Sequence, residues 1–222
     1  MLYTAYEIQR RAGAPVVAAS GLTARALHAL PAPLTRAPAV RHLRAACDII
    51  AKARPTHDRP AFGIDTVPVD GRPVAVFERA ATTTPFATLL HFTKPSVEGQ
   101  PRVLVVGPMS GHFTTLIRPT IRTLLSDHDV YVIDWHNARD ISVEHGTFGL
   151  DEYIEHVMDA LRHLGPDTHV VAVCQPAVPV LAAVALLAAA DDPAQPSSVT
   201  LMAGPVDTRI NPNRVNTAAE GK

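Results

Sequence analysis

The sequence is poor in cysteine, in net charge and in long apolar runs, and each shortage excludes a class of protein. Only two cysteines occur among 222 residues, Cys47 and Cys174, too few for the disulfide framework of a small secreted domain. The formal net charge of -1 gives no reason to expect nucleic acid or an anionic membrane as a partner. The hydrophobic content of 47% is that of an ordinary globular chain, long enough for one sizeable core or a core plus a cap.

The longest apolar runs are too short to cross a membrane. Residues 178–190 form a run of thirteen, whereas a spanning helix needs about 20. An N-terminal run at 12–19 is interrupted by Gly13 and Pro15, which does not fit a secretion signal. We therefore expect no transmembrane segment, and the low cysteine count favours a cytoplasmic location.

Residues 1–60 carry helical patterns and no obvious strand, which predicts a helical N-terminal extension. One helical face is marked by apolar side chains three or four residues apart: Val40, Leu43, Cys47 and Ile50. Because Cys47 belongs to this face, we interpret it as a buried core thiol. The segment 54–60 contains two prolines and predicts a linker.

Residues 61–222 alternate between short β-branched runs and helical patterns. The Asp-Gly turn at 70–71 predicts a hairpin over 64–77. Further strands are expected at 87–92, 102–106, 130–133, 169–173 and 198–203, helices at 114–125, 151–164 and 178–190, and a long ordered loop at 206–216. This alternation predicts an α/β fold with a mostly parallel sheet covered by helices on both faces.

The expected helix at 151–164 has a clear apolar stripe. Its inner face is predicted to consist of Ile154, Val157, Met158, Leu161 and Leu164. Acidic residues occupy its first turn and Gly165-Pro166 ends it.

Cys174 lies where the expected strand 169–173 turns sharply into a helix through Cys-Gln-Pro. A nucleophile on such a turn is the elbow of an α/β hydrolase, and the positive end of the following helix favours a thiolate. On context alone, a small buried residue at a strand end is an equally good interpretation, because free cysteine is usually part of a core.

A second turn favours the nucleophile. Gly107-Pro-Met-Ser-Gly-His112 follows the expected strand 102–106, and such a turn can offer backbone N–H groups to a developing oxyanion. The expected donors are the N–H groups of Gln175, Met109 and Ser110.

The histidines and acids give weaker signals. Three histidines lie on loops at the carboxyl edge of the expected sheet and are the candidates to approach Cys174: His112, His136 and His145. We expect His156 and His163 to be solvated. No His-x-x-x-His pair occurs, so we expect no metal site and no cofactor. Asp134 and Asp207 are strand-end acids or, more commonly for Asp, caps and turns.

Five segments in order make the chain similar to a known family: 1–10, 107–112, 130–135, 173–176 and 204–212. Together they resemble the intracellular polyhydroxyalkanoate (polyhydroxybutyrate) depolymerases. The resemblance implies an α/β-hydrolase fold and cleavage of the ester bonds of stored poly(3-hydroxybutyrate). The implied partner is the polymer at the granule surface in the cytoplasm, with no nucleic acid.

Within this resemblance Cys174 matches the nucleophile, and Cys-Gln-Pro takes the place of the usual Gly-x-Ser-x-Gly box. Family members continue past residue 222 through strands that bring the triad Asp and His, and neither has a matching position here. The resemblance therefore predicts 61–222 to be the N-terminal part of a hydrolase domain. It also predicts weak or no activity for this chain alone, and a complementary C-terminal fragment as a partner.

Two other functions stay open at this point. A polyhydroxyalkanoate synthase-like acyltransferase also uses a cysteine elbow, although Ala172 and Pro176 stand where synthases keep glycines. A non-catalytic granule-binding remnant would keep the polymer-binding surface without the triad.

Overall fold

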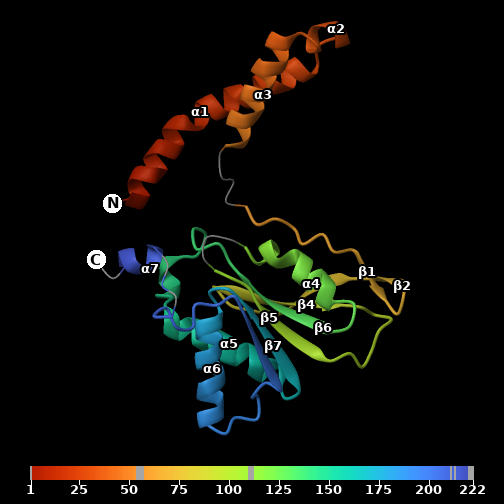
Figure 1. Cartoon of the computed structure of the whole chain (residues 1–222), viewed down its shortest axis with the longest axis vertical. Helices are drawn as coiled ribbons and strands as arrows, with labels where there is room; N and C mark the ends of the chain where they lie inside the picture. Colours follow the sequence, from red (N-terminus) through yellow and green to blue (C-terminus); the bar gives the residue numbers. More distant parts are fainter. Residues whose placement is uncertain (1, 54–57, 110–112, 211, 213, 220–222) are drawn as a thin grey trace. The chain divides into compact units, whose positions relative to one another are not determined.

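The computed structural model describes residues 2–53, 58–109, 113–210, 212 and 214–219. The chain divides into two compact units, Met1–Asp58 and Arg59–Lys222 (Figure 1). The first is helical and the second carries the sheet. No helix in the described ranges is long and apolar enough to cross a membrane.

The helical unit is a hairpin of two long helices with a short helix between them. Its elements are α1 (Leu2–His28), the short α2 (Ala32–Thr35) and α3 (Pro38–Lys52). α1 packs against α3 through small residues: a Cβ added to Gly21 would lie 3.8 Å from the Cβ of Ala51. His28 and Asp48 approach to 3.4 Å across the same interface.

The predicted apolar face of α3 is only partly buried. Cys47 is buried, which confirms the interpretation of its thiol as core. Leu43 and Ile50, expected on the same buried face, are 52% and 40% exposed, so that part of the prediction is wrong. Among the described elements α1 is the main partner of α3. One helix is too narrow to cover all the apolar side chains on this face of α3.

The second unit is built on a six-stranded sheet. Its strands are β3 (Phe77–Thr83), β4 (Ala87–Thr93), β5 (Arg102–Val106), β6 (Asp129–Trp135), β7 (Thr168–Val173) and β8 (Ser198–Met202). Their order is β3-β4-β6-β5-β7-β8, with β4 antiparallel to both neighbours and the other three pairs parallel. Each parallel crossover carries a helix, as the βαβ rule requires.

Helices cover both faces of this sheet (Figure 1). One face packs against the 3₁₀ turn η1 (Thr114–Ile117), α4 (Arg118–Leu124) and the hairpin of β1 (Thr66–Val69) and β2 (Arg72–Ala75). The other packs against α5 (Leu150–Leu164) and α6 (Ala177–Ala189). The side chains of β5 alternate between the two faces. Val103 and Val105 enter the core under α4, whereas Leu104 and Val106 enter the core under α5 and α6. The strand order and the two covered faces make this an α/β-hydrolase fold, as expected.

Three local expectations were wrong. Strand β3 was not predicted, because it lies at the sheet edge with every residue exposed and so carries no buried alternation. A short helix, α7 (Arg214–Ala219), lies where the end of a loop was expected. On α5 the buried residues include Tyr153 and Ala160, while Ile154 and Met158 are only partly buried at the margin facing α6.

A buried carboxylate, Asp134, lies near the carboxyl end of β6. It is 4% exposed, and Arg59 Nε donates to its Oδ2 at 2.5 Å. Its Oδ1 has no hydrogen-bond partner among the described residues. Burial raises the pKa of Asp134 above the ordinary value of 3.8, and Arg59 offsets only part of this effect.

We expect Asp134→Asn to change how stability depends on pH. A raised pKa means that the folded chain holds this proton more tightly than the unfolded chain does. The contribution of Asp134 to the free energy of unfolding therefore falls as the pH rises from 3.8 through the raised pKa. The free energy of unfolding of the Asn variant, relative to the parent, should therefore increase across that range. Urea unfolding followed by circular dichroism at several pH values measures it.

Asp140→Asn, the same change at an exposed carboxylate, is the control for the substitution itself. A difference between Asp134→Asn and the parent that stays constant from pH 4 to neutral would contradict the expectation.

Candidate functional site

Cys174 occupies a strained turn between β7 and α6. Its φ of 69° is in the left-handed region, which a side chain with a Cβ rarely adopts. The Cys174 N–H donates to Met202 O at 2.8 Å, and its carbonyl accepts from Ala177 N at 3.1 Å. The side chain is exposed. This is the backbone geometry of a nucleophile elbow, and it separates Cys174 from a buried strand-end residue.

The elbow forms without the two glycines of the usual box. Pro176, the N-cap residue of α6, has φ -59° and ψ -14°, angles that suit the proline ring. The close approach that needs a glycine lies just after the end of the neighbouring strand β8 instead. A Cβ on Gly204 would lie 2.0 Å from the Cβ of Ala177 and 3.0 Å from the Cys174 carbonyl oxygen. Gly204 is thus a site residue that sequence reasoning treated only as part of a family motif.

The structure brings Met109 and Gln175 together beside the elbow. The N–H of Gln175 has no acceptor among the described residues, which leaves it available to an oxyanion. The Met109 N–H is already occupied, because it donates to Oε1 of the Gln175 side chain at 3.1 Å. Ser110, the third expected donor, lies outside the described residues.

The turn that carries Met109 is fixed from beneath by aromatic side chains. Trp135 Nε1 and the Tyr153 hydroxyl both donate to the Gly107 carbonyl, at 3.2 and 3.4 Å. Gly107 is needed here, since a Cβ would lie 2.7 Å from Cγ2 of Thr114. Burial raises the pKa of Tyr153, so its hydroxyl stays protonated and can donate.

The described histidines do not supply a base to Cys174. His136 is held on the β4 side, with Nε2 2.8 Å from Thr88 Oγ1 and Nδ1 3.0 Å from Pro85 O. His145 ends the exposed turn η2 (Val143–His145). His112 lies outside the described residues. No described side chain hydrogen-bonds the Cys174 sulfur, so of the predicted bases neither His136 nor His145 is bonded to the nucleophile.

His156 is not solvated as expected. Its Nδ1 lies 2.7 Å from Glu152 O and its Nε2 3.1 Å from Thr84 Oγ1. Its ring packs against aromatic rings at 5.4 to 6.0 Å between centroids, those of Phe86, Trp135 and Phe148. The loop between β3 and β4 provides Thr84 and Phe86, and Trp135 comes from β6, so helix periodicity alone missed these contacts. His163 is exposed, as expected.

The two strand-end acids have structural partners. Asp207 accepts from the N–H and guanidinium of Arg209, at 2.8 to 3.0 Å, and these bonds lower its pKa. Asp134 is held by Arg59. Neither carboxylate is hydrogen-bonded to a histidine in the described part of the chain. Within those same residues no three His, Cys, Asp or Glu side chains are grouped as metal ligands.

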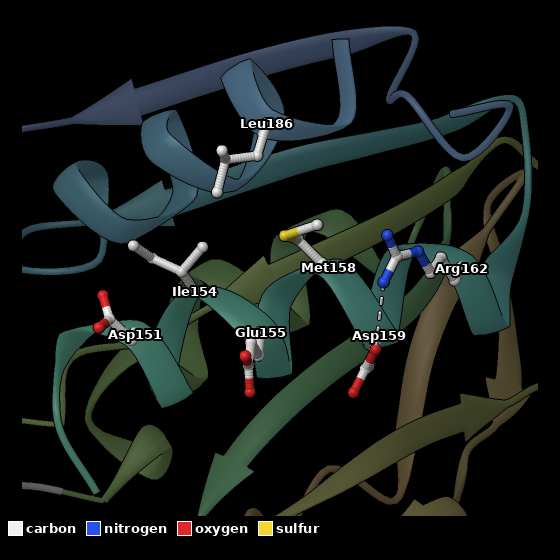
Figure 2. A pocket seen from close by; sticks show the side chains of 7 residues that line it. All are labelled: Asp151, Ile154, Glu155, Met158, Asp159, Arg162 and Leu186. Atoms are coloured by element: carbon white, nitrogen blue, oxygen red, sulfur yellow. Dashed lines mark ion pairs between the residues drawn. The ribbon is translucent and has the colours of Figure 1, made fainter. Parts of the chain in front are cut away.

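A separate groove of about 570 Å³ lies between α5 and α6. Figure 2 shows Ile154 and Met158 pointing toward Leu186 across the space between the helices, while Glu155 and Asp159 point away from it and Asp151 lies at the start of α5. Arg162, at one end, pairs with Asp159 and Asp192. Because the groove is lined by no nucleophile, the chemistry is better sought at Cys174.

Comparisons with known proteins add little to this geometry. No protein-family model matches the chain, and no curated protein matches it. One similar solved structure is a variant of LAE6, an α/β-hydrolase enzyme from the metagenome of Lake Arreo, Spain. It has 16% sequence identity and a TM-score of 0.42, over 86% of this chain. The match spans 58% of the length of that structure.

We expect Gly204→Ala to destabilise the elbow. The added methyl group would overlap Ala177, a rigid short side chain, and overpacking of this kind costs about 1–3 kcal/mol. Urea unfolding measures the loss. The matched control is Gly13→Ala in α1, where a Cβ meets nothing within 4 Å and the change should be neutral or stabilising.

The double variant Gly204→Ala with Ala177→Gly tests the cause. If the two Cβ atoms are the conflict, removing one should restore part of the stability lost in the single variant. Strictly additive losses would show that the close approach is not the reason.

Proposed function

We propose that the chain is a thiol-dependent ester hydrolase of the α/β-hydrolase fold, with polyhydroxyalkanoate polyester as its substrate class. One observation carries the chemistry: an exposed cysteine at φ 69°, on the turn between a core strand and a helix, beside an unoccupied backbone N–H. The substrate class rests on the resemblance of the segments around Cys174 and Gly107 to the intracellular depolymerases.

The proposed reaction has two steps. In the first, Cys174 thiolate attacks an ester carbonyl, the Gln175 N–H stabilises the oxyanion, and the alcohol end of the polymer leaves as it gains a proton. The product is a 3-hydroxyacyl thioester on Cys174. In the second, water attacks the thioester and releases the 3-hydroxy acid and the free thiol. The Cys174 thiol must give its proton to a base before the attack. No described side chain is hydrogen-bonded to the sulfur to take that proton.

We expect a soluble 3-hydroxybutyrate ester to acylate Cys174 and not Cys47. Cys47 serves as an internal control because it is buried in the helical hairpin, whereas Cys174 is exposed. Mass spectrometry of the acid-quenched, digested protein locates the acyl group. Cys174→Ala should abolish the adduct and, with it, whatever weak ester turnover the chain shows.

Cys47→Ser provides the matched variant, which should keep both the adduct and the turnover. Turnover that survives Cys174→Ala, or no adduct and no turnover even with an activated ester, would contradict the proposed chemistry. Release of 3-hydroxybutyrate from polyester particles tests the substrate class separately.

We expect the Gln175 side chain to lower the activity of the site by occupying the Met109 N–H. An oxyanion that uses the Met109 N–H must first displace Gln175 Oε1, so Gln175→Ala should raise kcat/KM about five-fold, the value of one hydrogen bond. Gln195→Ala, at an exposed glutamine distant in sequence, is the control. A fall in kcat/KM on Gln175→Ala would show instead that the side chain positions the Met109 turn.

A non-catalytic polymer-binding protein is the second candidate function. The observation that favours it is the lack of a described histidine or carboxylate bonded to the Cys174 sulfur. Co-sedimentation with polyester particles, without ester cleavage and unchanged by Cys174→Ala, distinguishes it from the enzyme.

A further inference from the structure

The outer face of α1 is an apolar stripe with no described partner. Three large side chains mark it, Ile8, Val16 and Leu22, which are 65%, 61% and 67% exposed. The helical period places Ala12, Pro15 and Ala19 on the same face, all exposed and none charged. We call these six residues the α1 stripe.

The α1 stripe is not the core of the hairpin. The opposite face of α1, which includes the buried Ala24 and the close-packed Gly21, meets α3. On α3 itself Leu43 and Ile49 are 52% and 68% exposed. Exposed aliphatic surface of this extent on a small helical unit is typical of a segment that binds another surface.

The net charge of the helical unit indicates which kind of surface the α1 stripe could bind. Residues 1–58 contain eight Arg and Lys against three Asp and Glu, a formal net charge of +5 with His neutral. Within the unit Glu7 pairs with Arg10 and Asp48 with His28, which leaves most of the basic side chains without an acid of this unit beside them in sequence. The remaining 164 residues contain twelve basic against eighteen acidic side chains, so the near-neutral whole chain conceals a basic part.

Basic side chains border the stripe. Arg11 follows Ile8 by three residues and Arg25 follows Leu22 by three, so each lies beside the apolar face, and both are exposed. A second copy docked stripe to stripe would bring two units of +5 together. A neutral polyester offers nothing to complement the charge.

We propose that the helical unit binds an anionic lipid surface through the α1 stripe. The aliphatic side chains enter the boundary between headgroups and acyl chains, while the arginines at its border contact anionic headgroups. α1 then lies along the interface without crossing it. The proposal is independent of the chemistry at Cys174.

Vesicle co-sedimentation of the whole chain tests this. The chain should bind vesicles of phosphatidylglycerol, bind vesicles of phosphatidylcholine much more weakly, and lose the difference as salt is raised. Cys174→Ala should bind as the parent does. Equal binding to the two lipids, no binding to either, or binding only to neutral polyester particles would overturn the proposal.

The stripe itself is tested by Ile8→Glu combined with Leu22→Glu. This variant removes apolar surface and adds like charge to the lipid, so the apparent affinity for phosphatidylglycerol vesicles should fall about ten-fold or more. The matched control is Val143→Glu, at a valine 92% exposed in the other unit, which should bind within about two-fold of the parent.

Two further measurements separate the remaining explanations. If the Glu variant loses helix by circular dichroism, Arg11→Gln with Arg25→Gln leaves the stripe intact and must still weaken binding to phosphatidylglycerol. Unchanged binding in that variant would overturn the proposal. So would a lipid-free dimer that the stripe variant dissociates, since a second copy would then occupy the face.

Discussion

The site depends on the contact between the elbow and the end of β8. The left-handed backbone of Cys174 is unfavourable by itself, and it persists because neighbouring groups hold it. The Met202 carbonyl accepts from its N–H, and the missing side chain of Gly204 lets the first turn of α6 lie close. Because Cys174 is both strained and exposed, its position is set by the contacts of its backbone with the end of β8 and with the first turn of α6, and hardly at all by its own side chain.

Much of the fold follows from local sequence, because buried parallel strands and amphipathic helices leave strong periodic signals. The runs around Val103 and Val170 and the stripe of α5 were sufficient to place the central sheet. The edge strand β3 left no such signal, since a fully exposed strand has no apolar side to repeat. His156 shows the same limit: two of its partners, Thr84 and Phe86, come from a loop about seventy residues earlier, which helix periodicity does not encode.

The sequence predicted the location of the candidate site, but it did not predict the hydrogen bonds within it. The turn at Cys174 and the turn at Met109 were expected at the same sheet edge, and the side chain of Gln175 joins them. That bond was not predictable, because only three-dimensional structure shows which N–H a side chain reaches. Whole-chain net charge also hides a detail, since averaging over both units conceals a helical part with an excess of five positive charges.

The hydrogen bond from Trp135 to the Gly107 carbonyl gives the molecule an internal optical reporter. Trp135 is the single tryptophan of the chain, it is 2% exposed, and its indole stacks edge-on against Tyr153 at 4.4 Å. Its indole N–H holds the same turn whose next residues lead to Met109. Indole emission responds to the loss of such a bond and to entering water, so the fluorescence of the unlabelled protein follows the opening of this turn.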